Sequence, residues 1–164
     1  MIELLRLDER LIHGQVAAGW AKAIKFDTLL VIDDESANDT FLTNTLYMAA
    51  PANIKTFVMT TEKAMEVLTD PRCHDRHVFV VVRTIETLLH VAQNAPDIQL
   101  VQVSNFGRMV PNKGGERKGY GGHLFLNDDE AKLLKTVLNT GLPCVMQMAP
   151  NSPKTELKDL LKNV

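Results

Sequence analysis

The sequence predicts an α/β protein with one open, mostly parallel β-sheet and helices on both faces. Short apolar runs alternate along the chain with longer segments of helical period. One run, Val78–Val82, is apolar at every position, which is typical of a central parallel strand covered on both sides. A chain of 164 residues also suits one domain, spanning 1–164. Strands and helices in alternation favour an open sheet with right-handed crossovers.

Six segments are predicted to be strands because each is short and apolar: Ile2–Leu7, Thr28–Ile32, Ile54–Met59, Val78–Val82, Ile98–Val103 and Cys144–Met148. Helices are expected in the gaps and at the end: Val16–Ile24, Thr40–Met48, Glu62–Leu68, Thr84–Asn94, the segment from Asn127 to Gly141, and Thr155–Lys162. The helix after Asn127 has the clearest boundaries. Asn127 is an N-cap with Glu130 three residues later, and Gly141 ends the helix.

One segment, Ser104–Gly122, breaks this alternation. It is rich in glycine, contains Pro111 and four basic residues, and shows neither a helical nor a strand period. Connections of this length are usually functional or mobile, so we expect a flap or a docking surface rather than a nucleotide-binding loop. His123 borders this segment, and the sequence leaves open whether it approaches the site.

Composition excludes several classes of function. The net charge of -2 gives no basic field for nucleic acid or an anionic membrane surface. No apolar run approaches the roughly 18 residues of a spanning helix, and the N-terminus lacks a secretory signal, so a cytoplasmic protein without direct membrane insertion is expected. Cys73, His74 and His77 lack a second ligand pair at zinc-site spacing. No metal or other cofactor is therefore expected.

The first strand leads into the most informative loop of the chain. In open α/β sheets, ligands bind beyond the carboxyl ends of the strands. Asp8, Arg10 and His13 all lie between the strand Ile2–Leu7 and the first helix. A neutral imidazole can attack phosphorus, and a carboxylate that accepts its other ring N–H would orient it, with Asp8 the nearer candidate. Arg10 would bind the phosphoryl oxygens with its planar fork.

Backbone groups complete the expected anion site. The free N–H groups at the start of the first helix, around Gly14 and Gln15, would donate to the phosphoryl group, and Gly14 allows close approach. Asp34, which follows the second strand, and Asn105, which follows the fifth, are candidates for the rim of the site.

The run Arg6–Val16 resembles the signature of the IIB components of the mannose/sorbose family of bacterial sugar phosphotransferase systems. That signature has the form Arg-Ile-Asp-x-Arg-Leu-Ile-His-Gly-Gln-Val, with a Trp soon after, and here Trp20 follows. The likeness continues through Asp33–Asp39 and Met48–Pro51 and, weakly, to Ala149-Pro150. The resemblance spans nearly the whole chain, so one phosphotransferase IIB domain over 1–164 is expected.

The resemblance implies an enzyme, a protein-histidine phosphotransferase that works without a cofactor. His13 would accept a phosphoryl group from the phosphohistidine of a IIA protein, as a pros-phosphohistidine, and pass it to a sugar during uptake through membrane IIC and IID components. The protein would then associate peripherally with the inner face of the membrane. The sequence does not name the sugar, which can be a hexose, a ketose or an amino sugar, nor the oligomeric state, a homo-oligomer included.

The chain departs from the family pattern after the fifth strand. The family typically reads Asn-Val-Gly-x-Met there, whereas this chain reads Ser-Asn-Phe-Gly-Arg-Met over 104–109, followed by the glycine-rich loop Lys113–Gly122. Two other functions stay open on residues alone. One is a hydrolase with a phosphohistidine intermediate, for which Ile12-His13-Gly14 is a poor match. The other is a non-catalytic α/β interaction module.

Overall fold

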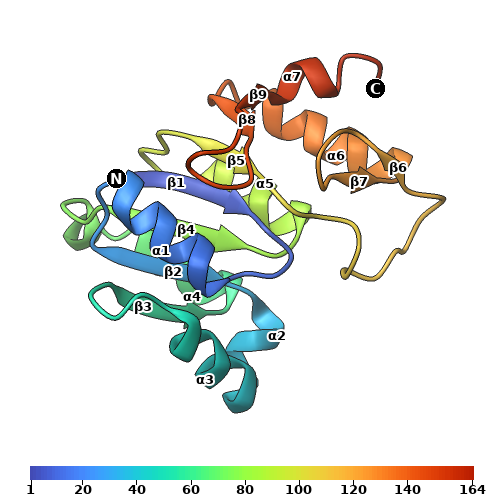
Figure 1. Cartoon of the computed structure of the whole chain (residues 1–164). Coiled ribbons are helices and arrows are strands. Elements are labelled where there is room, and N and C mark those ends of the chain that lie inside the picture. Colours follow the sequence, from blue (N-terminus) through green and yellow to red (C-terminus); the bar gives the residue numbers. More distant parts are fainter.

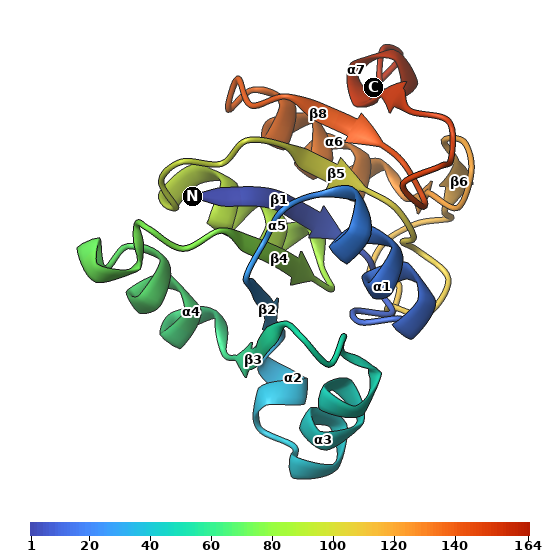
Figure 2. The same cartoon turned by 60° about the vertical axis from the view of Figure 1, so that its left-hand side comes forward.

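A seven-stranded sheet in the order β3-β2-β4-β1-β5-β8-β9 forms the centre of the computed structural model, which describes all residues 1–164 (Figure 1). Its strands are β1 (Ile2–Leu7), β2 (Thr28–Ile32), β3 (Lys55–Met59), β4 (Val78–Val82), β5 (Val101–Val103), β8 (Cys144–Met146) and β9 (Thr155–Glu156). All neighbours pair in parallel except β8 and β9. The strand arrows of β1, β4, β5 and β8 accordingly point the same way in Figure 2.

Helices cover both faces of the sheet, as predicted. They are α1 (Gly14–Ala23), α2 (Asp34–Ala37), α3 (Thr40–Ala49), α4 (Thr61–Leu68), α5 (Ile85–Asn94), α6 (Asp128–Leu138) and α7 (Leu157–Leu160), with a short 3-10 turn, η1, at Pro71–Cys73. Figure 1 shows α1 in front of the sheet and α5 behind it. None of these helices has the length and apolar character that crossing a membrane would require.

Alternation along the strands divides the core into two clusters. Leu30 and Ile32 of β2 belong to the cluster that includes residues of α4, α5 and α6, whereas Leu29 and Val31 belong to the cluster that includes Trp20 of α1 and Leu46 of α3. Side chains of a strand point to opposite faces in turn, so a strand buried on both sides must be apolar throughout. β4 meets this condition at all five positions, which confirms its predicted place inside the sheet.

Some predicted boundaries were wrong. Thr155-Glu156, expected as the start of the last helix, pairs antiparallel with β8 as β9, so α7 begins at Leu157. The fifth strand begins at Val101, after a single bridge between Ile2 and Ile98, and the strand at Cys144 ends at Met146. Elements of two to four residues are too short to show a period.

The glycine-rich segment 104–122 is tied to the body of the protein by Arg117. This guanidinium donates to the backbone oxygens of Gly107 (2.9 Å) and Val110 (2.8 Å) and pairs with Glu130 of α6 at 2.6 Å. A small antiparallel pair follows, β6 (Lys118–Gly119) with β7 (Phe125–Leu126). Its first strand lies within the segment expected to have no strand period.

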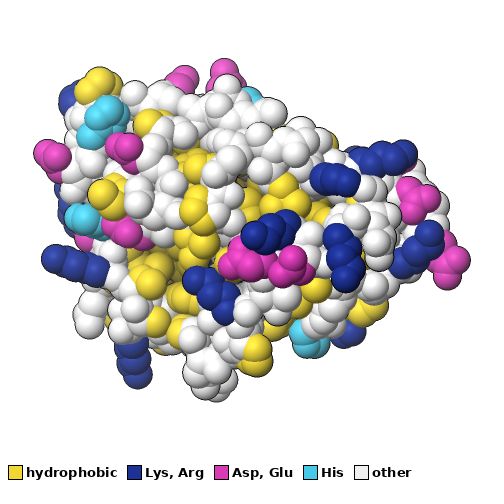
Figure 3. All heavy atoms as spheres, turned by 90° about the horizontal axis from the view of Figure 1, so that it is seen from above, with side chains coloured by type: hydrophobic (Ala, Val, Ile, Leu, Met, Phe, Trp, Pro, Cys, Tyr) yellow, Lys and Arg dark blue, Asp and Glu magenta, His cyan; other side chains and the backbone are white.

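Charge is distributed evenly on the face seen in Figure 3. Acidic and basic side chains are interspersed on it, with exposed apolar side chains between them, so this side carries no continuous field of one sign. That distribution agrees with the small net charge of the sequence.

Candidate active site

The first connecting loop leaves the carboxyl end of β1, between β4 and β5, where the sheet order predicts a ligand site. The backbone N–H of Asp8 donates to Val82 of β4, and that of Glu9 donates to Asn105 after β5. The chain then turns, with Leu11 N–H donating to the Asp8 carbonyl at 2.9 Å. Leu11 has a φ of 58°, a left-handed conformation that costs a non-glycine residue about 1–2 kcal/mol. Its buried side chain in the core beside α1 offsets this strain.

A buried arginine lies beneath this turn. The Arg6 guanidinium donates to Gln102, to Ser104 Oγ (2.6 Å), to the carbonyl oxygens of Gln147 (3.1 Å) and Met148 (2.8 Å), and to Asp8 (3.1 Å). Burial lowers the pKa of Arg6, and the neighbouring Asp8 carboxylate counteracts part of that shift. The group nonetheless stays charged at neutral pH. Sequence reasoning gave Arg6 no separate role.

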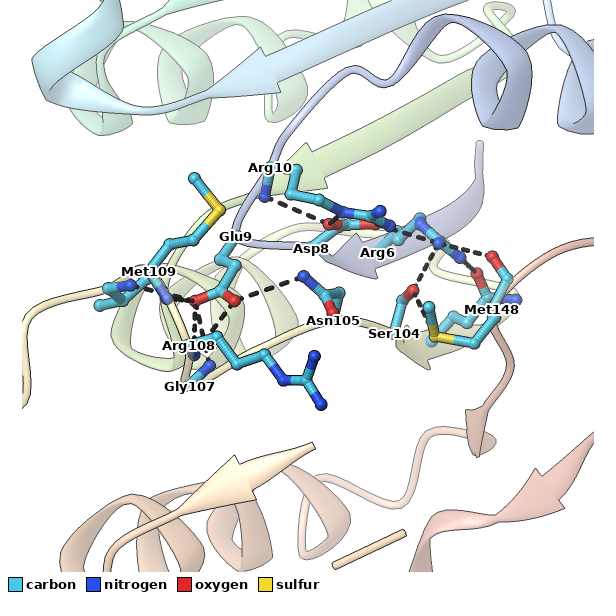
Figure 4. Close-up of polar contacts among 12 residues, drawn as sticks. Arg6, Asp8, Glu9, Arg10, Ser104, Asn105, Gly107, Arg108, Met109 and Met148 are labelled. Carbon is cyan, nitrogen blue, oxygen red and sulfur yellow. Dashed lines mark hydrogen bonds and ion pairs between the residues drawn. The ribbon is translucent and has the colours of Figure 1, made fainter. Parts of the chain in front are cut away.

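Asp8 lies between two guanidinium groups (Figure 4). Its carboxylate, which is 1% exposed, accepts from Arg6 Nη2 and from the Nε (3.1 Å), Nη2 (3.2 Å) and backbone N–H (3.2 Å) of Arg10. These hydrogen bonds hold the pKa of the Arg10 guanidinium above its ordinary value. Asp8 thereby fixes the orientation of Arg10.

The expected hydrogen bond between Asp8 and the imidazole of His13 is absent, because both Asp8 oxygens accept from arginine. The sequence carried a signal for this arrangement. Arg6, Asp8 and Arg10 are spaced at intervals of two, the spacing that places side chains on one side of an extended chain.

His13 is exposed and immediately precedes α1, as its N-cap residue. The side chain makes no capping hydrogen bond. The other helices of eight residues or more, α3 to α6 in chain order, have side-chain caps from Asp39, Thr60, Thr84 and Asn127 respectively. The first N–H groups of a helix have no partner within the helix, so those of α1, at Gly14 and Gln15, remain available to a ligand. Both residues are exposed.

Both predicted rim residues form hydrogen bonds within the protein. Asp34 accepts from the backbone N–H (2.6 Å) and hydroxyl (3.2 Å) of Thr61, and so joins α2 to the start of α4. Asn105 is buried, and its amide donates to Glu9 at 3.3 Å. His123 is exposed, and its carbonyl oxygen accepts from the N–H of Phe106.

Glu9 was missed from the sequence altogether. Its carboxylate accepts from the backbone N–H groups of four successive residues, Gly107 to Val110, at 2.9–3.1 Å. Figure 4 shows these bonds converging on Glu9 beside the pair of Asp8 and Arg10. Gly107 has a φ of 100°, and a Cβ there would lie 1.9 Å from the Phe125 carbonyl oxygen, so only glycine fits.

The fold and the site together define an α/β protein with an uncapped helix start, an oriented arginine and an exposed histidine beyond the carboxyl end of the central strand β1. These groups suit an enzyme that binds an anion. The sequence model of the protein family described as PTS system sorbose subfamily IIB component matches residues 2–164 of this chain. The chain therefore belongs to that family, whose members are sugar phosphotransferases.

Individual relatives agree with this assignment. The chain is 32% identical to a probable phosphotransferase enzyme IIB component of Streptococcus pyogenes, over 98% of this chain and 99% of that protein. It is 24% identical to the mannose-specific EIIAB component of Escherichia coli, over 100% of this chain and 49% of the relative. The crystal structure of manxB from Thermoanaerobacter tengcongensis superposes with a TM-score of 0.86 at 29% identity, covering 99% and 96% of the two chains.

Proposed function

We propose that this IIB component is a phosphocarrier that accepts a phosphoryl group on His13 from the phosphohistidine of a IIA protein. It then transfers the group to a hexose, ketose or amino sugar during uptake through membrane IIC and IID components. The observation that carries the proposal is the exposed, unbonded ring of His13 at the uncapped start of α1. A IIA partner is supported by the relative named EIIAB, about half of whose length this chain matches.

In the first step the neutral His13 ring attacks the phosphorus of the donor phosphohistidine with a ring nitrogen. A new N–P bond forms as the N–P bond of the donor breaks, and the donor imidazole leaves with the electron pair. In the second step a sugar hydroxyl oxygen attacks the same phosphorus, the N–P bond to His13 breaks with its electron pair left on the ring nitrogen, and the hydroxyl proton is taken up by the released imidazole. The Arg10 guanidinium and the N–H groups of Gly14 and Gln15 offset the charge on the phosphoryl oxygens in both steps.

Asp8 has a positioning part in this mechanism, because it holds Arg10 by two side-chain bonds. The oxygens of a phosphoryl group accept best from donors that are already oriented. A homo-oligomer and peripheral membrane association through IIC and IID are compatible with this function and remain predictions.

The test is phosphorylation in a reconstituted system. The protein is incubated with phosphoenolpyruvate, the two general phosphotransferase proteins and a IIA protein, and the acid-labile phosphate is mapped. We expect phosphate on His13, none on His13→Ala, and unchanged labelling on the control His90→Ala, which alters an exposed histidine of α5.

Two results would contradict the proposal. Phosphate that remains after His13→Ala would remove His13 as the acceptor. Rapid loss of phosphate to water in the absence of sugar and permease would indicate a hydrolase instead of a carrier.

A further inference from the structure

The side chain of Glu9 ties the turn that carries Arg10 to a segment about a hundred residues later in the chain. Its carboxylate is 2% exposed and takes the N–H groups of Gly107, Arg108, Met109 and Val110 together with the Asn105 amide. The backbone N–H of Glu9 adds a bond to the Asn105 carbonyl oxygen at 2.8 Å. Side chain and main chain of one residue are thus fixed to the same segment.

This attachment lies next to the phosphoryl-binding group. Glu9 lies between Asp8 and Arg10 in the sequence. The Arg10 guanidinium donates to the Asp8 carboxylate at 3.1 and 3.2 Å. Asp8 is held in turn by the buried Arg6. Arg10 therefore has two supports, Arg6 through Asp8, and the segment 105–110 through Glu9.

We propose that Glu9 is a positioning residue for phosphoryl transfer, which holds the turn so that the free N–H groups of Arg10 face the phosphoryl group on His13. The inference rests on the proposed function. Glu9 does not touch the phosphoryl group, since its carboxylate is surrounded by donors from Asn105 to Val110. A misplacement of about 1 Å in such a site can slow a reaction on the order of a hundredfold.

A purely structural role for Glu9 would be to order the segment 107–110, and the chain provides a control for that role. Glu130 supports the same segment through Arg117, with which it pairs and which donates to the carbonyl oxygens of Gly107 and Val110. Glu130 forms no hydrogen bond or ion pair with the turn of Arg10, because its side-chain partners are Arg117 and Asn127. Glu130→Gln keeps the capping interaction of α6, for which glutamine also serves, and weakens only the hold on the segment.

The experiment compares Glu9→Gln with Glu130→Gln in single-turnover transfer from a phosphorylated IIA protein. We expect Glu9→Gln to slow transfer about tenfold or more at saturating donor with little change in the KM for the donor. Glu130→Gln should transfer at the wild-type rate. Glu9→Asp, which keeps the negative charge on a shorter side chain, should lie between wild type and Glu9→Gln, and it replaces Glu9→Gln if the latter does not fold.

A double variant tests whether Glu9 acts through Arg10. If it does, Glu9→Gln should add little to the slowing caused by Arg10→Lys, because coupled residues give non-additive effects. The inference is overturned if Glu9→Gln transfers at the wild-type rate. It is also overturned if Glu130→Gln slows transfer as much as Glu9→Gln does, or if the effects of Glu9→Gln and Arg10→Lys on the rate multiply in the double variant.

A second readout does not depend on transfer. The NMR signal of the Arg10 Nε–H group should shift or broaden in Glu9→Gln and stay in place in Glu130→Gln. If the wild-type protein accepts no phosphate, the proposed function fails and this signal alone decides the role of Glu9. An unchanged Arg10 signal in Glu9→Gln would then refute the positioning.

Discussion

Replacing Arg10 with lysine should separate charge from geometry at the proposed phosphoryl-binding site. A guanidinium has five N–H donors, and Arg10 uses one on Nε and one on Nη2 to hold Asp8, which leaves three for a ligand. A lysine ammonium has three donors in all and cannot grip Asp8 and face an anion in the same fixed orientation. The substitution therefore keeps the charge but loses the preorganised donors.

The expected cost falls on the rate of transfer. Loss of one oriented donor to a developing oxyanion costs about 2.7–4 kcal/mol, or about 10²–10³ in rate. The free energy of unfolding should change by about 1 kcal/mol or less, because lysine keeps the positive charge on a partly exposed side chain and the buried Asp8 carboxylate keeps its ion pair with Arg6. Rapid-quench measurement of phosphoryl transfer from a phosphorylated IIA protein, with a thermal melt of each variant, checks both numbers.

Arg72→Lys is a matched control. Arg72 bonds to Asp70, two residues earlier, through the same three groups, its backbone N–H (2.9 Å), Nε (3.1 Å) and Nη2 (2.6 Å). It lies in η1, before β4 and so at the opposite edge of the sheet from His13. The reasoning is refuted if Arg10→Lys transfers at the wild-type rate, or if Arg72→Lys is slowed to the same extent.

Two further predictions concern the resting protein. Inorganic phosphate should shift the His13 ring signals in NMR at high concentration, since charge–dipole terms at exposed helix ends are only about 0.3–1 kcal/mol; ring signals that do not move would mean that the partner protein completes the site. Burial raises the pKa of the Cys144 thiol to about 11, so at pH 8 iodoacetamide should label Cys73 and spare Cys144, and equal labelling by mass spectrometry would contradict this. Because the folded-state pKa is raised, the contribution of this thiol to stability is full below about pH 9 and declines as the pH rises towards 11.

The sheet was predictable because its central strands satisfy a local rule. β1, β2 and β4 have the bounds expected from the sequence, and β4, which is covered on both faces, is apolar at every position. β9 and the pair of β6 and β7 could not be predicted, because two residues show no period. What fixes them is pairing with strands elsewhere in the fold.

The candidate site was predictable in its location and less so in its contacts. The loop after β1 holds Asp8, Arg10 and His13 as expected, but proximity in sequence suggested the wrong partner for Asp8. Glu9 could not be assigned, because its partners lie between Asn105 and Val110, and no local pattern marks four backbone N–H groups that converge on one carboxylate. Contacts of this kind arise only when distant loops meet at the edge of the sheet.

Under the proposed function, charge balance in the turn would allow the site to hold a phosphoryl group and still release it. Arg6, Asp8, Glu9 and Arg10 carry two positive and two negative charges, and each is bonded to protein groups in the resting state. The turn therefore has no surplus positive charge to trap an anion. A phosphoryl group on His13 gains only the outward N–H groups of Arg10 and the start of α1, whose contribution is modest at an exposed helix end. Once the group passes to a sugar, the bonded turn needs no rearrangement before the next transfer, which suits a carrier that must bind and release the same group in every cycle.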